Sequence, residues 1–111
     1  MEQQLELFPT AQEEAFVAVR GTVPAGLKRY ERFDFCTTLM VALRGLLDIE
    51  RRELSDQELD EVDAMVDKLQ GMWGVTTQAI NRLIALTRPL TPTAQNYLLT
   101  WLGTFLATSP F

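Results

Sequence analysis

Apolar residues recur at steps of three and four along most of this chain, a spacing typical of helices with one buried face. The most regular stripe consists of Leu59, Val62, Val66, Leu69 and Trp73. The stripe before it consists of Cys36, Leu39, Met40, Leu43, Leu46 and Leu47. The stripe after it consists of Ile80, Leu83, Ile84 and Leu86. Together they predict three helices in the middle of the chain.

Local start and stop signals define the first part of the chain. A T-x-x-E capping box at Thr10 predicts a first helix over residues 12–20. The glycines and the proline of residues 21–26 predict a loop. A long second helix is then expected from about Leu27 to the charged segment 48–53.

The second part of the chain carries similar signals. A second capping box at Ser55 begins the third helix, and either Thr76 or Thr77 caps the fourth. The fourth helix is expected to end before Pro89, because the residue that precedes a proline avoids the helical conformation. Residues 91–93 begin a fifth helix.

The expected fifth helix lies in a segment, residues 89–111, without any charged residue. Its large apolar residues cover more than one face and are Tyr97, Leu98, Leu99, Trp101, Leu102, Phe105 and Leu106. It is too short for a membrane span, which needs about 20 apolar residues, so it must be buried in the core or in a subunit interface. We expect a homodimer, because a five-helix domain of this size has little room to enclose one helix completely. The candidate interface residues are Leu98, Trp101, Leu102 and Phe105.

Length and composition are those of one small globular domain. The chain has 111 residues, 47% of them hydrophobic, a net charge of −5 and no low-complexity segment. A single cysteine excludes an internal disulfide, and the N-terminus is acidic and amide-rich instead of basic and then apolar. We therefore expect a cytoplasmic all-α protein: an extended tail over residues 1–9 and a bundle of about five helices over residues 10–111.

Candidate catalytic and metal-binding residues are few. The chain has no histidine, which removes the usual general base at neutral pH and the commonest transition-metal ligand. The acids of residues 56–67 follow the spacing of a calcium loop, but such a loop needs glycine where this chain has Glu61. Glutamate pairs such as Glu58 with Glu61 are expected to face away from the apolar stripes, and Cys36 is expected to be a small buried hydrophobe. We predict no enzyme activity, no metal and no cofactor.

One basic and aromatic cluster suggests contact with nucleic acid. Four cations, Arg20, Lys28, Arg29 and Arg32, alternate with three aromatic residues, Tyr30, Phe33 and Phe35. Acids at positions 31 and 34 lie among them, and aromatic residues at helical spacing usually belong to a core. The sequence therefore favours a core role for these rings.

Residues 73–84 resemble the turn and recognition helix of helix-turn-helix DNA-binding proteins, with a glycine turn, a valine, polar residues and then an inward isoleucine and leucine. The resemblance implies that Gln78, Asn81 and Arg82 would face DNA. The preceding helix departs from the pattern, because Gln70 stands where such proteins have a small residue.

The N-terminal stretch Gln4-Leu5-Glu6-Leu7-Phe8 resembles the peptide by which bacterial polymerases and mismatch-repair proteins dock on the replication sliding clamp. The resemblance implies that Leu7 and Phe8 fill an apolar pocket of the clamp and that Gln4 makes orienting hydrogen bonds, with Leu5 also in contact. The alternative is that these apolar side chains fold back over the first helix.

The sequence thus favours a small, acidic, non-enzymatic bacterial adaptor or regulator that binds a protein partner through its tail. A DNA-binding regulator of the helix-turn-helix type and a purely structural homo-oligomer are the alternatives.

Overall fold

In the computed structural model of the protein, the backbone is described for residues 9–108 and the side chains for residues 13–108. Over these residues the chain is all-α, with five helices and no strand, which confirms the expected fold class. The helices are α2 (Pro9–Thr22), α3 (Arg29–Arg51), α4 (Asp56–Gly71), α5 (Thr77–Thr87) and α6 (Pro92–Thr108).

Side-chain caps begin α4 and α5 as expected. The Ser55 hydroxyl accepts a hydrogen bond from the Glu58 backbone N–H (3.2 Å), and the Glu58 carboxylate accepts one from the Ser55 N–H (2.9 Å). At α5 the cap is Thr76, whose Oγ1 accepts a hydrogen bond from the Ala79 N–H (3.0 Å). These bonds satisfy N–H groups that have no partner within the helix, so both boundaries are fixed by local chemistry.

The first helix is longer than the predicted range of residues 12–20. It begins at Pro9, because proline is tolerated in a first turn, and Thr10 therefore lies inside the helix and is not its cap. It also continues through Gly21, and the Thr22 hydroxyl donates a hydrogen bond to the carbonyl one turn earlier (2.8 Å). The first helix thus begins three residues before its predicted start at residue 12.

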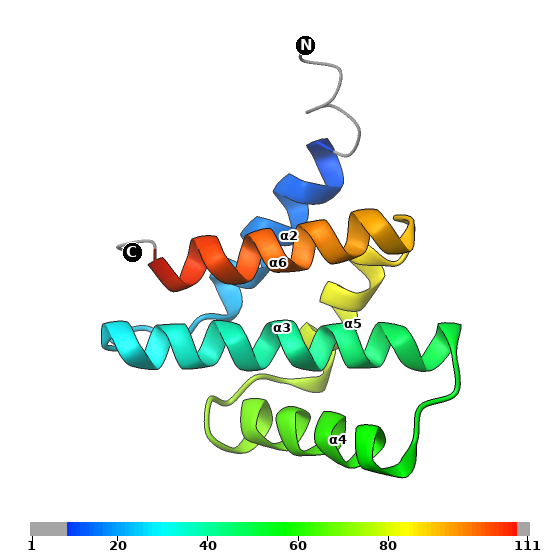
Figure 1. The fold of residues 1–111 in the computed structure, drawn as a ribbon. Helices are drawn as coiled ribbons and strands as arrows, with labels where there is room; N and C mark the ends of the chain where they lie inside the picture. Colours follow the sequence, from blue (N-terminus) through cyan, green and yellow to red (C-terminus); the bar gives the residue numbers. More distant parts are fainter. Residues whose placement is uncertain (1–8, 109–111) are drawn as a thin grey trace.

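The helices form a flat body of 42 × 37 × 21 Å. In Figure 1, α6, α3 and α4 lie side by side with α3 in the middle and antiparallel to both neighbours, while α2 and α5 lie behind them. Close contacts hold this layer together. Gly45 of α3 packs directly on the Val62 side chain of α4, and the Arg44 guanidinium donates a hydrogen bond to Thr100 Oγ1 of α6 (2.7 Å).

The core lies between the two layers and draws on every described helix. Its largest fully buried apolar side chains are Phe35, Leu69, Leu83, Leu98 and Leu106. The α6 helix is not buried nearly all round, as its composition predicted, because only one of its sides faces the core. Tyr97 is 54% exposed and Phe105 is 40% exposed. None of the described helices is long and apolar enough to cross a membrane.

Candidate functional site

The predicted clamp-binding residues, Gln4, Leu5, Leu7 and Phe8, lie outside the described residues. The structure does describe where the chain after them begins. The α2 helix starts at Pro9, and its first turn projects beyond α6, on the opposite side of the bundle from α4 (Figure 1). The described chain therefore begins at an edge of the bundle.

The α2 helix is fixed to the body by its second half. Ala15 and Val19 are buried in the core. Phe16 packs edge-on against two aromatic rings of α6, with its centroid 6.0 Å from that of Trp101 and 5.3 Å from that of Phe105. Ala15, Phe16 and Val19 are thus anchoring residues among the described side chains of α2.

The predicted interface residues of α6 divide between core and surface. Leu98 and Leu102 are buried inside the subunit and are not available to a partner. Trp101 is half-buried, and it stacks on the exposed Phe105 with ring centroids 5.3 Å apart and planes 9° apart. A surface hollow of about 390 Å³ beside Trp101 is lined only by uncharged residues of α6, namely Thr93, Asn96, Tyr97, Thr100, Trp101 and Thr104.

The three residues of the predicted DNA-reading face, Gln78, Asn81 and Arg82, are all exposed on α5. The helix pair that should present them is not formed in the described part of the chain. In a helix-turn-helix unit the two helices pack on each other, whereas here α4 packs mainly on α3 and α5 mainly on α2. The glycine turn is present, with Gly74 at φ +76°, but it leads to a different arrangement.

The basic and aromatic cluster at the start of α3 also differs from its expected core role. Only Phe35 is in the core, where it is fully buried and meets Trp73 edge-on at 5.6 Å. Tyr30 is 67% exposed and Phe33 is 57% exposed. These two rings point to the surface because they lie on sides of α3 that no other described helix covers.

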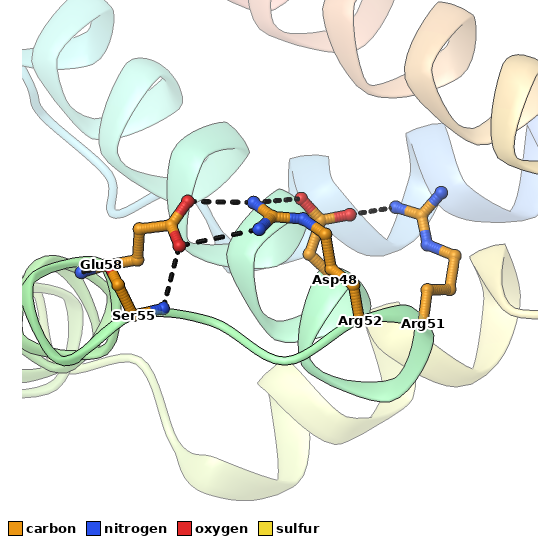
Figure 2. Close-up of polar contacts among 5 residues, drawn as sticks. All are labelled: Asp48, Arg51, Arg52, Ser55 and Glu58. Atoms are coloured by element: carbon orange, nitrogen blue, oxygen red, sulfur yellow. Dashed lines mark hydrogen bonds and ion pairs between the residues drawn. The ribbon is translucent and has the colours of Figure 1, made fainter.

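A network of charged side chains joins the end of α3 to the start of α4 (Figure 2). Arg52 pairs with Glu58 (2.8 Å) and lies 3.9 Å from the Asp48 carboxylate, which also pairs with Arg51. The same Glu58 carboxylate caps α4 through Ser55. The network thus fixes the corner between the two helices. The sequence carries a signal for this network, an arginine six residues before a capping-box glutamate, but the helical patterns alone do not predict it.

This network changes the acidity of Glu58. The hydrogen bond from Arg52, followed by the one from the Ser55 backbone, lowers the pKa of the Glu58 carboxyl to about 2. Hydrogen bonds to the charged form favour ionisation. Glu58 therefore stays charged at neutral pH and serves as a cap and ion-pair partner.

Cys36 is buried, as expected for a small hydrophobe in the stripe of α3. Burial raises the pKa of its thiol to about 11, although the charge of Arg32 opposes part of this shift. Within residues 13–108, no three side chains of the histidine, cysteine, aspartate or glutamate type come together as a metal-binding group.

Comparison of the chain with known protein families, with curated proteins and with solved structures finds no match.

Proposed function

We propose that this chain is a non-enzymatic interaction module of the bacterial cytoplasm whose N-terminal peptide docks on the replication sliding clamp. The observation that carries the proposal is the stretch Gln4-Leu5-Glu6-Leu7-Phe8, which ends directly before the first residue of α2. Clamp-binding peptides act as short extended segments. A position in front of a helical body suits that role.

The attachment of the peptide supports this proposal. A residue that precedes a proline avoids the helical conformation, so the sequence Phe8-Pro9 favours the extended backbone that a docking peptide requires. Among the described side chains of α2, Ala15 and Phe16 fix the helix to the body. These contacts lie outside the peptide itself, so we expect a partner to bind the peptide without displacing them.

Binding of the intact chain to a purified bacterial clamp tests this function. The double change Leu7→Ala and Phe8→Ala should weaken binding by roughly 800-fold, because each of the two anchors contributes roughly 2 kcal/mol. The matched control is Val17→Ala, which trims a 65% exposed apolar side chain of α2 outside the peptide and should leave the affinity unchanged. Absence of binding by the intact chain, or equal binding by the double variant, would reject the proposal.

We further propose that the module forms a homodimer through the outer face of α6. An interface between two copies of the chain needs a face without like charges, because each copy carries a net charge of −5. The α6 helix carries no charged residue, and it exposes Tyr97 and Phe105 beside the half-buried Trp101. Trp101 and Phe105 belong to the predicted set, whereas Tyr97 takes the place of Leu98 and Leu102, which are buried in the core.

Sedimentation analysis tests this dimer, which should have twice the 12.6 kDa mass of the chain. Tyr97→Glu should produce the monomer, because it brings two charges together across the interface. The control is Met72→Glu, which places the same charge at a 64% exposed apolar position after α4 and should leave the dimer intact. A wild-type protein of monomer mass at high concentration would contradict the interface.

A further inference from the structure

Two aromatic rings stand next to each other at the surface where α3 begins. Tyr30 is 67% exposed and Phe33 is 57% exposed, and no other described aromatic side chain is as exposed as either. Residues three apart on a helix are neighbours on its surface. In Figure 1 the first turns of α3 extend beyond the last turn of α6 and beyond α4, so the rings stand on a projecting end of the helix. Two adjacent exposed rings indicate a surface that binds a partner.

Two unpaired cations lie beside these rings. Lys28 and Arg29 are exposed, and neither makes an ion pair with any residue that the structure describes. The acids of the same turns are already engaged. The Glu31 carboxylate accepts a hydrogen bond from the Lys28 backbone N–H (2.9 Å), and Asp34 pairs with Lys68 of α4 (2.9 Å). The projecting end therefore combines exposed rings with cations that a partner's carboxylates can reach.

A groove lies further along α3, between that helix and the start of α4. This α3–α4 groove has a volume of about 230 Å³, and its apolar lining consists of Val41, Gly45, Leu54 and Val62. Carboxylates of the lining outnumber its arginines, and one of them, Glu61, makes no ion pair with any described residue. The volume suits one side chain, because pockets for drug-sized ligands measure about 300–1,000 Å³.

The surroundings of the α3–α4 groove are acidic. Residues 53–63 hold six acids and no cation. Of the two arginines that line the groove, Arg52 is paired with Glu58 (2.8 Å), and Arg44 donates a hydrogen bond to Thr100 of α6 (2.7 Å). Because carboxylates are in excess here, this region attracts a cationic surface and disfavours an anionic one.

The projecting end of α3 cannot reach the α3–α4 groove of its own molecule. Tyr30 and Gly45 are 15 residues apart on one continuous helix, which corresponds to about 22 Å along its axis. Rings that enter the groove must therefore belong to another molecule. The projecting end of a second copy matches the groove in polarity and in charge.

We propose that the protein associates head to tail, with Tyr30 and Phe33 of one copy docked on the α3–α4 groove of the next copy. The rings pack on Val41 and the other apolar residues of the lining, while Lys28 and Arg29 lie against the acids at the start of α4. Since the two sides of this contact are different surfaces, association continues beyond two molecules unless it closes into a ring. The contact uses neither α6 nor the N-terminal peptide, so it is separate from the proposed dimer and from clamp docking.

Sedimentation equilibrium at low salt and high protein concentration tests this contact in the Tyr97→Glu variant, in which the proposed α6 interface is broken. This variant, a monomer at physiological salt, should then form larger species, and added salt should dissociate them because exposed charge pairs are screened. Further replacement of both rings, Tyr30→Ala with Phe33→Ala, should weaken association at least tenfold, since aromatic anchors dominate such contacts. The control Val17→Ala, at a 65% exposed position of α2, should change it less than twofold.

Reversal of one charge tests the groove side of the contact. Glu61→Lys should weaken association roughly fivefold, because it places a cation where Lys28 and Arg29 arrive. The matched control is Glu14→Lys, which makes the same change at an exposed position of α2 and should alter association less than twofold. Equal effects of the two changes would mean that net charge alone controls association, and would overturn the proposal.

A mixture of two variants, both carrying Tyr97→Glu, gives the sharpest test. The ring variant keeps an intact groove, and a groove variant, Val41→Lys with Glu61→Lys, keeps intact rings. Neither should associate with itself, whereas an equimolar mixture should form complexes of one copy of each and nothing larger. Unchanged circular dichroism spectra would confirm that both variants fold.

Three results would overturn the proposal: a Tyr97→Glu protein that stays monomeric at low salt and high concentration, equal association after removal of both rings, or a mixture that forms no complex. Association that survives Tyr97→Glu undiminished at physiological salt but is lost with the rings would support this contact and reject the α6 dimer. Failure of one proposal can therefore be told from failure of the other.

Discussion

Adding one methyl group at Gly45 tests how closely α3 and α4 pack. A Cβ at this position would overlap Val62 Cγ2 and would lie 3.5 and 3.6 Å from Val62 Cβ and Cγ1. Val62 is only 7% exposed, and a β-branched side chain on a helix has one strongly preferred χ1 rotamer. The valine therefore cannot rotate away freely. The two helices must move apart to accept Gly45→Ala.

The change in the free energy of unfolding caused by Gly45→Ala is the balance of two effects. Overpacking a core contact costs about 1–3 kcal/mol, whereas alanine is better than glycine inside a helix by roughly 0.5–1 kcal/mol. We therefore expect Gly45→Ala to lower the free energy of unfolding by about 1 kcal/mol. The same change at Gly21, which lies in α2 and has nothing within 4 Å of its added Cβ, should raise it by roughly 0.5–1 kcal/mol.

Urea unfolding followed by far-ultraviolet circular dichroism measures the free energy of unfolding of both variants. The two glycine variants should differ by about 1.5–2 kcal/mol, although the chemical change is identical. A double-mutant cycle of Gly45→Ala with Val62→Ala should show coupling of at least about 1 kcal/mol, because the smaller side chain removes the overlap. If Gly45→Ala stabilises the protein as much as Gly21→Ala does, α3 and α4 are not in close contact at this position.

Three further predictions concern single side chains. Glu58→Gln should lower the melting temperature at pH 7, with the difference shrinking as the pH falls below about 4.5 and vanishing near 2. The reason is that the pKa of Glu58, about 2 in the folded protein, lies below its unfolded value; a constant difference down to pH 2 would contradict this. The Cys36 thiol should react with a disulfide reagent at pH 8 only after denaturation, because it is buried and its pKa is about 11; rapid labelling of the native protein would refute its burial. Phe35→Ala should cost about 3–5 kcal/mol in urea unfolding, whereas Phe33→Ala should change stability by less than about 0.5 kcal/mol, and equal losses would refute the assigned exposures.

Much of the fold was predictable from the sequence because its signals are local. The caps at Ser55 and Thr76 bond to N–H groups three residues away, and the apolar stripes depend only on helical geometry. The length of the first helix was less predictable. Glycine weakens a helix without ending it, so Gly21 gave a stop signal that the structure does not follow.

The candidate sites depended on different kinds of information. The clamp-binding peptide is a hypothesis from the sequence alone, because Gln4–Phe8 lie outside the described residues. The aromatic residues at the start of α3 were visible in the sequence, but their exposure was not. Tyr30, Phe33 and Phe35 are all aromatic residues in the first two turns of α3, so their local sequence does not distinguish them. Only the positions of α4 and α6 around α3 decide which ring is buried.

What the sequence determined by itself is therefore the set of helices, since each helix is specified by residues close together in the chain. The tertiary structure decided which faces remain open: Leu98 is in the core while Tyr97, the residue before it, is at the surface. It also paired Asp34 of α3 with Lys68 of α4, which lies 34 residues later in the chain. Exposure and net local charge depend on neighbours from distant segments, and no local pattern carries that information.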